Sequence, residues 1–219
     1  MAQGPHGVRS EAHRPVAVGR NGMVCAGHPL AAEAGIAVLR QGGTAADAAL
    51  AVAAALNVVE PNMSGMGGDG FIMVYDQVKG LRVMNATGPA PRGATLEKYQ
   101  SGGIPMKGIR SVSVPGLVAG WLEVHSTSGR LALKSVLAPA IDLAESGFPV
   151  SLKLARGITD DPMLATFSAS RAIFTRDGTP LGVGDLLVQR DLANSLRALS
   201  EGGADAFYRG VLAKAIVQC

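Results

Sequence analysis

Four glycines stand within eight residues at positions 64–71, in the stretch SGMGGDGF, and a loop of this composition could bind phosphate. A phosphate loop lies between a strand and the start of a helix, whose amide groups point at the anion. Here an alanine-rich helical pattern precedes the loop and a strand pattern follows it, and neither G-x-G-x-x-G nor Gly-Lys-Ser/Thr is present. We therefore interpret the loop as a packing element, in which glycine permits positive φ and close backbone approach. Asp69 within it is expected to bind a backbone amide, with a cation as the alternative.

The other residues that could do chemistry do not form a recognisable set. The four histidines are His6, His13, His28 and His125, and their spacing is not that of metal ligands. We therefore predict neither a metal site nor a cofactor. His28 precedes a proline and is expected to start a helix, while His125 is expected to be exposed or structural. Cys25 and Cys219 could form a disulfide, but two separate thiols fit a reducing compartment better. The G-x-S-x-G motif of a serine nucleophile is absent.

Periodicity predicts an α/β (α+β) chain in which helices and strands alternate. Strand patterns cover residues 22–27, 71–76, 81–86 and 108–116, and helical patterns cover 28–43, 45–59, 117–129, 133–147, 190–203 and 210–219. Thr44 is expected to cap the second helix, with Asp47 in its first turn. Asp191 is expected to cap the helix that Gly202 and Gly203 end, and Pro139 should mark a helix start or a kink.

Composition restricts the class of protein. At 219 residues, with 47% apolar and 17% charged residues, the chain is long enough for one folded domain and too apolar for disorder. A net charge of +3 with scattered basic residues argues against a nucleic-acid or membrane surface. The most apolar segment, residues 45–59, is shorter than the roughly 20 residues that span a bilayer, so we expect a buried helix. Residues 1–20 form an expected flexible lead-in without the apolar run of a secretory signal, which predicts a cytoplasmic protein.

A long collinear stretch resembles the N-terminal part of the large subunit of the γ-glutamyltranspeptidase (glutathione hydrolase) family. The matching features are Gly-Gly-x-Ala-x-Asp-Ala at residues 42–48, Val-Glu-Pro at 59–61 and Gly-Gly-x-Gly-Phe at 67–71. Further stretches follow in the same order, including SVSVPGLVAGW at residues 111–121 and LKSVLAPAIDLAESGFPVS at 133–151. The resemblance covers residues 21–219, which we treat as one large-subunit domain, truncated at its C-terminus.

The resemblance implies an N-terminal-nucleophile hydrolase fold, an αββα sandwich that this chain would hold only in part. Such enzymes cut their own precursor before a threonine, whose hydroxyl then attacks γ-glutamyl amides with its free α-amino group as the base. That threonine belongs to the small-subunit segment of the same precursor, so we expect no catalytic residue here and an inactive chain on its own. Two alternatives remain: a non-catalytic module that binds a small acid or a partner protein, and a related amidase or acylase with another acyl group.

One substrate contact of the family falls within this stretch. The resemblance places an arginine that pairs with the substrate's α-carboxylate three residues before an Ala-Pro, and here Ala90-Pro91 puts Thr87 at that position. A threonine cannot replace a bidentate guanidinium. Arg92 is the candidate to reach the same space, with a surface-loop arginine as the alternative. A branch of the family shares Asn-x-Ser/Thr-Gly-Pro-Ala-Pro here, so the predicted substrate contacts are Thr87 and Arg92, and glutathione itself is in question.

Overall fold

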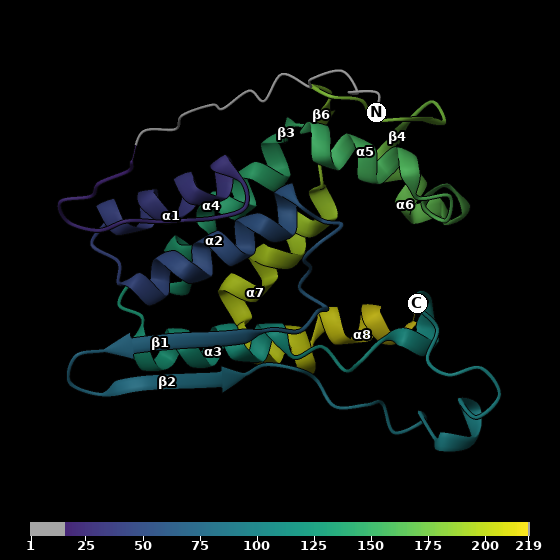
Figure 1. Ribbon diagram of the computed structural model, residues 1–219, viewed down its shortest axis with the longest axis horizontal. Helices are drawn as coiled ribbons and strands as arrows, with labels where there is room; N and C mark the ends of the chain where they lie inside the picture. Colours follow the sequence, from purple (N-terminus) through teal and green to yellow (C-terminus); the bar gives the residue numbers. More distant parts are fainter. Residues whose placement is uncertain (1–15, 219) are drawn as a thin grey trace, which may run out of the picture.

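The computed structural model describes residues 16–218 as a mixed α+β chain rich in helices (Figure 1). The α-helices are α1 (Pro29–Arg40), α2 (Ala45–Val59), α3 (Leu117–Ser128), α4 (Leu133–Ser146), α5 (Leu152–Asp160), α6 (Ser168–Phe174), α7 (Arg190–Tyr208) and α8 (Val211–Gln218). Three short 3₁₀ turns are η1 (Leu96–Lys98), η2 (Ile109–Ser111) and η3 (Leu164–Thr166). The strands are β1 (Phe71–Asp76), β2 (Gly80–Asn85), β3 (Phe148–Pro149), β4 (Thr175–Arg176), β5 (Thr179–Pro180) and β6 (Leu186–Leu187). They pair antiparallel as β1–β2, β3–β6 and β4–β5.

Three sequence predictions fall outside the described part. Most of the expected lead-in at residues 1–20 lies there, together with His6 and His13. Cys219 lies there as well, so the structure does not test its relation to Cys25, which is exposed.

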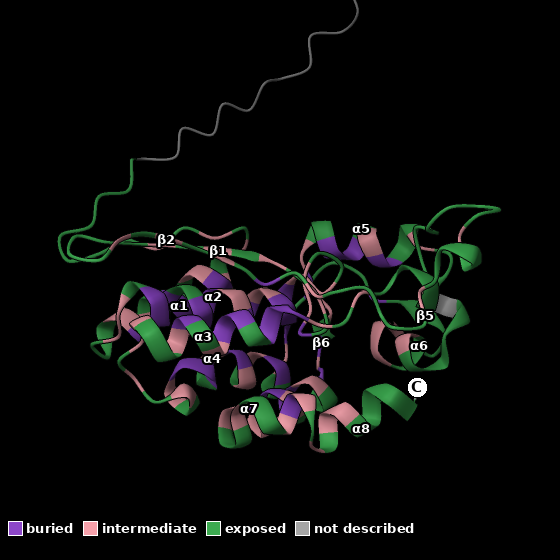
Figure 2. Ribbon diagram, turned by 90° about the horizontal axis from the view of Figure 1, so that it is seen from below, coloured by how far each residue is buried: buried purple, intermediate pink, exposed green. Residues whose placement is uncertain are grey.

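Helix α2 forms the centre of the helical layer and packs against α1, α3 and α4 (Figure 1). Its alanines and valines are buried along most of its length, as the purple segments of Figure 2 show. Small side chains let the neighbouring helices approach closely, which suits a core with few aromatic rings. The predicted buried helix is thus confirmed. Among the described helices, none combines the length and apolar character that crossing a membrane requires.

The starts of α1 and α2 follow the predicted chemistry. His28 caps α1, because its ring Nδ1 accepts a hydrogen bond of 3.2 Å from the amide of Leu30. Burial lowers the pKa of His28, which favours the neutral ring that this acceptor role needs. At the start of α2, the Thr44 hydroxyl accepts from the Asp47 amide while the Asp47 carboxylate accepts from the Thr44 amide. This reciprocal pair is a capping box.

Two predicted strands are wrong. Residues 22–27 form neither a helix nor a strand, and no described strand pairs with them. Residues 108–116 begin with a 3₁₀ turn at Ile109–Ser111 and continue as a loop, in which the Val114 amide donates to the Pro89 carbonyl. Strand preference reflects packing against a neighbouring strand, and without such a neighbour these apolar segments do not form one.

The later helices also correct the prediction in detail. Gln189, not Asp191, is the N-cap of α7, and Asp191 lies in the first turn. Gly203 ends the first helical segment, as predicted: its φ of 54° is not helical, and a second helical segment follows it to Tyr208 within the range of α7. Pro139 lies inside α4 with helix on both sides, so of its two predicted roles it does not mark the start of that helix. Its missing N–H leaves one carbonyl of the preceding turn without its helical donor.

The β1–β2 hairpin lies over α3 and has two different faces (Figure 1). Its register pairs Met73 with Val83 and Tyr75 with Leu81. The inner face carries partly buried side chains toward α3, such as Ile72, whereas the outer face is apolar and 58–72% exposed: Phe71, Met73, Tyr75, Leu81 and Val83. An exposed face of this kind typically marks an interaction surface.

Candidate functional site

The glycine loop between α2 and β1 forms hydrogen bonds with the backbone amides at the start of α3. The carbonyl of Gly68 accepts hydrogen bonds from the amides of Gly116 (3.2 Å) and Leu117 (2.9 Å). These amides are the groups with which a helix start would bind an anion. The loop therefore contributes its own carbonyl where a phosphate would sit, which agrees with the packing interpretation of residues 64–71.

Two glycines of this loop, Gly68 and Gly70, allow close approach, whereas Gly65 and Gly67 have open space beside them, and the expected positive φ is wrong. The glycines with positive φ lie elsewhere in the described chain, and the loop's own four do not belong to them. A Cβ on Gly70 would lie 2.9 Å from the Leu117 side chain. A Cβ on Gly116 would collide with the carbonyl of Ala86, the residue after β2. The absence of side chains thus lets the start of α3 touch the end of the hairpin.

Asp69 joins this loop to the chain that leaves β2. Its Oδ1 accepts from the amide of Gly88 at 2.9 Å, and its Oδ2 accepts from the hydroxyl of Ser113 at 2.9 Å. The predicted backbone-amide contact is confirmed. Asp69 therefore fixes the residue that directly follows Thr87.

Thr87 lies at the rim of a hollow of about 410 Å³ between the end of β2, the start of α3 and the end of α7. Its amide (2.9 Å) and its hydroxyl (2.6 Å) both donate to Oδ1 of Asn85, two residues back. This turn leaves the oxygen of the exposed Thr87 hydroxyl able to accept a further hydrogen bond. The ionisable residues in the lining are Glu123 and Tyr208, and no lysine or arginine of the described chain lines it.

Tyr208 is held in place by two backbone contacts. Its hydroxyl donates to the carbonyl of Pro115 at 3.0 Å and accepts from the amide of Ala119 at 2.9 Å. Burial raises the pKa of Tyr208, so the phenol is neutral at physiological pH. The hollow therefore has one carboxylate, Glu123, and no opposing positive charge from its own walls.

The structure does not bring Arg92 to Thr87. Arg92 is exposed within a turn in which the Ala94 amide donates to the Pro91 carbonyl at 2.8 Å. It does not line the hollow. Sequence analysis also missed three residues at this place: Asn85, Glu123 and Tyr208. The spacing Asn85-x-Thr87 is the pattern of an Asx turn and could have been recognised, whereas no local pattern points to the other two.

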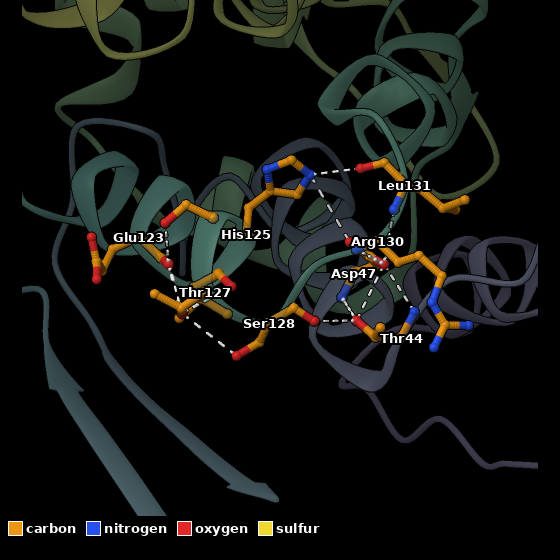
Figure 3. A network of polar contacts seen from close by, with 10 residues as sticks. Thr44, Asp47, Glu123, His125, Thr127, Ser128, Arg130 and Leu131 are labelled. Atoms are coloured by element: carbon orange, nitrogen blue, oxygen red, sulfur yellow. Dashed lines mark hydrogen bonds and ion pairs between the residues drawn. The ribbon is translucent and has the colours of Figure 1, made fainter. Parts of the chain in front are cut away.

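A second polar cluster joins α2, α3 and the start of α4 (Figure 3). The carboxylate of Asp47 is fully buried, and Oδ2 accepts from the amides of Thr44 (2.8 Å), Arg130 (2.9 Å) and Leu131 (3.3 Å). His125 Nε2 lies 4.0 Å from Oδ1 of Asp47 and 2.8 Å from the carbonyl of Leu131. Because a carbonyl only accepts, Nε2 carries the proton. His125 is thus structural, one of the two roles that its sequence position predicted.

The electrostatics of Asp47 also indicate a structural role. Burial by itself would raise the pKa of Asp47, but hydrogen bonds from the Thr44, Arg130 and Leu131 amides outweigh it, and the pKa lies below its usual value. An Asp–His pair can suggest catalysis, yet this carboxylate is fully buried and accepts hydrogen bonds from three backbone amides. Within residues 16–218, no group of three or more histidine, cysteine or acidic side chains is placed to hold a metal.

Known proteins match both the fold and the order of these elements. Residues 31–219 match the family model of Gamma-glutamyltranspeptidase. The Glutathione hydrolase proenzyme of Bacillus subtilis (strain 168) is 42% identical over 213 residues, and the match covers 93% of this chain and 36% of that protein. The Acylase ACY 1 proenzyme of Pseudomonas sp. (strain SE83) is 39% identical, with 91% of this chain and 38% of that protein covered.

Solved structures agree. The γ-glutamyltranspeptidase of Helicobacter pylori superposes with a TM-score of 0.88 at 32% identity, covering 93% of this chain and 61% of that one. A cephalosporin acylase of Bacillus halodurans superposes with a TM-score of 0.87 at 35% identity, and the match covers 99% of this chain and 42% of that one.

The fold is that of the N-terminal-nucleophile hydrolases, in the α+β form that transpeptidases and acylases share. Within that class, the chain belongs to the γ-glutamyltranspeptidase family. It corresponds to the N-terminal part of the large subunit and spans little more than a third, 36%, of its curated Bacillus subtilis relative.

Proposed function

We propose that this chain is the N-terminal part of an enzyme that cleaves γ-glutamyl or related amides through a processed N-terminal threonine located elsewhere in the same precursor. The match to the family over residues 31–219 carries the proposal, because it covers most of the chain. In such an enzyme the threonine hydroxyl attacks the amide carbonyl, and its α-amino group takes the proton. Backbone amides stabilise the oxyanion, and water or an amine then releases the acyl group.

In this scheme the chain's own contribution is the end of the hairpin. Asp69 accepts a hydrogen bond from the amide of Gly88, and the Asn85 side chain accepts one from the amide of Thr87. Gly116 has no side chain, which lets the start of α3 pack against the backbone of this segment. Such support limits the freedom of the segment that contacts the acyl group, and positioning of this kind is a large part of catalysis. Thr87 is the proposed contact, whereas the position of Arg92 outside the hollow speaks against its taking part.

A related amidase or acylase is the second candidate, and the charge of the hollow favours it. The resemblance implies a carboxylate-binding arginine at position 87, where this chain has a threonine and where Glu123 lines the same hollow. An acyl group with a free carboxylate would meet no positive charge from these walls. Acylases among the relatives, such as the 39% identical Acylase ACY 1 proenzyme, support an acyl group other than γ-glutamyl.

The proposed partner is the remainder of the precursor, which the names of the proenzyme relatives support. The exposed outer face of the hairpin is the surface where a second layer would pack. A non-catalytic module that binds an unrelated partner through this face is the alternative.

The test is expression of the complete reading frame, followed by a denaturing gel and an assay with two anilides. Splitting of the product before a threonine, together with release of aniline from γ-glutamyl-anilide or γ-aminobutyryl-anilide, would support an enzyme. The second anilide lacks only the α-carboxylate, so the ratio of the two kcat/KM values separates the two candidates. A product that neither splits nor turns over either anilide would support the binding module.

A further inference from the structure

A cavity of about 310 Å³ lies apart from the hollow beside Thr87 and shares no lining residue with it. It is formed where the end of α2, the segment around Lys107, α5, η3 and α6 meet. Its wall is mainly apolar, with Leu154, Ile158, Met163, Leu164, Phe167 and Phe174. Small-molecule sites have this character: apolar and aromatic walls, a few polar groups, and a volume from about 300 Å³ upward.

Two features indicate that the space is kept open. Gly157 lines it from the middle of α5, although glycine is unfavourable inside a helix. A Cβ there would lie 3.2 Å from the side-chain nitrogen of Asn62, so a side chain would intrude on the cavity wall. Phe167 and Met163 line the same space and remain 54% and 37% exposed. Apolar surface is thus left uncovered where a ligand could bury it.

The polar part of the cavity is an ion pair. Lys107 Nζ lies 2.9 Å from each carboxylate oxygen of Asp161, and Oδ1 of Asp161 also accepts from the Met163 amide at 3.0 Å. The two side chains are 53% and 34% exposed. An exposed pair of this kind contributes little to stability, so separating its partners costs little.

We propose that this cavity binds a free apolar α-amino acid. The ligand's side chain lies among the phenylalanine, leucine and isoleucine side chains, its α-carboxylate pairs with Lys107 and its α-ammonium pairs with Asp161. A simple anion would satisfy Lys107 but face the Asp161 carboxylate, and a simple cation would face Lys107. A zwitterion gives each charge an opposite partner, while the apolar wall selects for a large hydrophobic side chain. This proposal does not depend on the proposed enzymatic function, because it involves none of the residues around Thr87.

The test is calorimetric titration of the full chain with L-phenylalanine, whose ring suits the two phenylalanines of the wall. We expect saturable binding. N-acetyl-L-phenylalanine lacks the ammonium and L-phenylalaninamide lacks the carboxylate, and each should bind about tenfold more weakly, since one charge-assisted hydrogen bond is lost. L-Alanine keeps both charges and should also bind more weakly, because it leaves the apolar wall uncovered.

Variants locate the binding. Lys107→Met and Asp161→Asn should each weaken L-phenylalanine binding about tenfold, while Lys134→Met, an exposed lysine on α4, should leave it unchanged. Gly157→Leu should abolish binding by filling the cavity, with circular dichroism to check that the chain is folded. If that variant unfolds, the two charge variants still decide. Absence of saturable binding, equal binding of the three phenylalanine compounds, or full binding by Lys107→Met would overturn the proposal.

Discussion

Asp69 in the glycine loop accepts a 2.9 Å hydrogen bond from the backbone amide of Gly88, on the far side of the β1–β2 hairpin. With its second oxygen on the Ser113 hydroxyl, this one carboxylate ties together three segments that meet at the hollow. The loop is therefore neither a phosphate cradle nor a passive turn. It anchors the segment that carries Thr87.

Removal of this anchor should loosen that segment. Asp69→Ala removes two hydrogen bonds to a charged acceptor and should lower the free energy of unfolding by about 1–3 kcal/mol, as thermal unfolding measures. Exchange of the Gly88 amide hydrogen should accelerate, because its acceptor is gone. Asp69→Asn keeps one acceptor oxygen, so its free energy of unfolding and its Gly88 exchange rate should lie between those of Asp69→Ala and of the original chain. Asp205→Ala is the control, since its carboxylate makes only an exposed i,i+4 pair with Arg209. Equal exchange rates in Asp69→Ala and the original chain would contradict the anchoring role.

Thr87→Arg should shift the preference of the complete enzyme toward substrates with an α-carboxylate. A guanidinium pairing with a carboxylate contributes about 1.5–3 kcal/mol, so the ratio of kcat/KM for γ-glutamyl-anilide over γ-aminobutyryl-anilide should rise roughly tenfold to a hundredfold. The exposed rim position gives the longer side chain room. Arg92→Ala is the matched comparison and should leave the ratio unchanged, because Arg92 does not line the hollow. A fall in the ratio with Arg92→Ala would instead place that arginine in the acyl site.

Local chemistry predicted the parts of the fold that local contacts determine. Pro29, Thr44 and Asp47 signalled two helix starts, because their partners lie within three residues along the chain. The hairpin followed from alternating apolar residues and a short turn. Long-range partners were not predictable in this way. No residue pattern near 108–116 indicates that the segment lacks a neighbouring strand. Gln189 is the N-cap of α7 without a side-chain capping bond, and its side chain instead donates to the carbonyl of Val58 in a distant helix, a contact that no local spacing predicts.

The candidate site likewise contains residues that the sequence could predict and residues that only long-range contacts place there. Thr87 was predicted from the family resemblance, and the amide-binding role of Asp69 was predicted from its place as a carboxylate in the glycine loop. Tyr208 enters the hollow from the end of α7 and contacts Pro115, ninety-three positions away, so no spacing could have placed it there. Arg92 was proposed from its closeness to Thr87 in the sequence, and it lies in the turn at residues 91–94, outside the lining of the hollow.

Asp47 should make the chain sensitive to acid. Its folded-state pKa lies below the ordinary value of an aspartate, so the unfolded chain binds the proton more readily. The stabilisation is therefore fully present above about pH 3.8 and is lost as the pH falls through the folded-state pKa. Asp47→Asn should cost about 3 kcal/mol near neutral pH, because an amide replaces a buried charge that three backbone amides solvate. Urea unfolding between pH 3 and 7 measures both effects, and the cost of the variant should shrink at the acid end.

The control for that experiment is Asp205→Asn, in which the free energy of unfolding should fall with decreasing pH as steeply as in the original chain. A constant cost of Asp47→Asn across the whole range would show that the carboxylate's charge does not contribute. Asp47 would then stabilise the chain by packing and neutral hydrogen bonds and not by its charge.

The outer face of the hairpin should control association of the chain. Met73 and Val83 are cross-strand partners there, 69% and 59% exposed, and burying such a side chain contributes about 1.5–3 kcal/mol. Met73→Thr with Val83→Thr keeps residues that favour strands while removing apolar surface. The isolated chain should then self-associate at least tenfold more weakly in sedimentation velocity, and assembly of the complete precursor should be impaired. Val78→Thr is the matched control, because Val78 is 94% exposed but lies in the hairpin turn. Unchanged association and assembly in the double variant would mean that the remainder of the precursor packs on another surface.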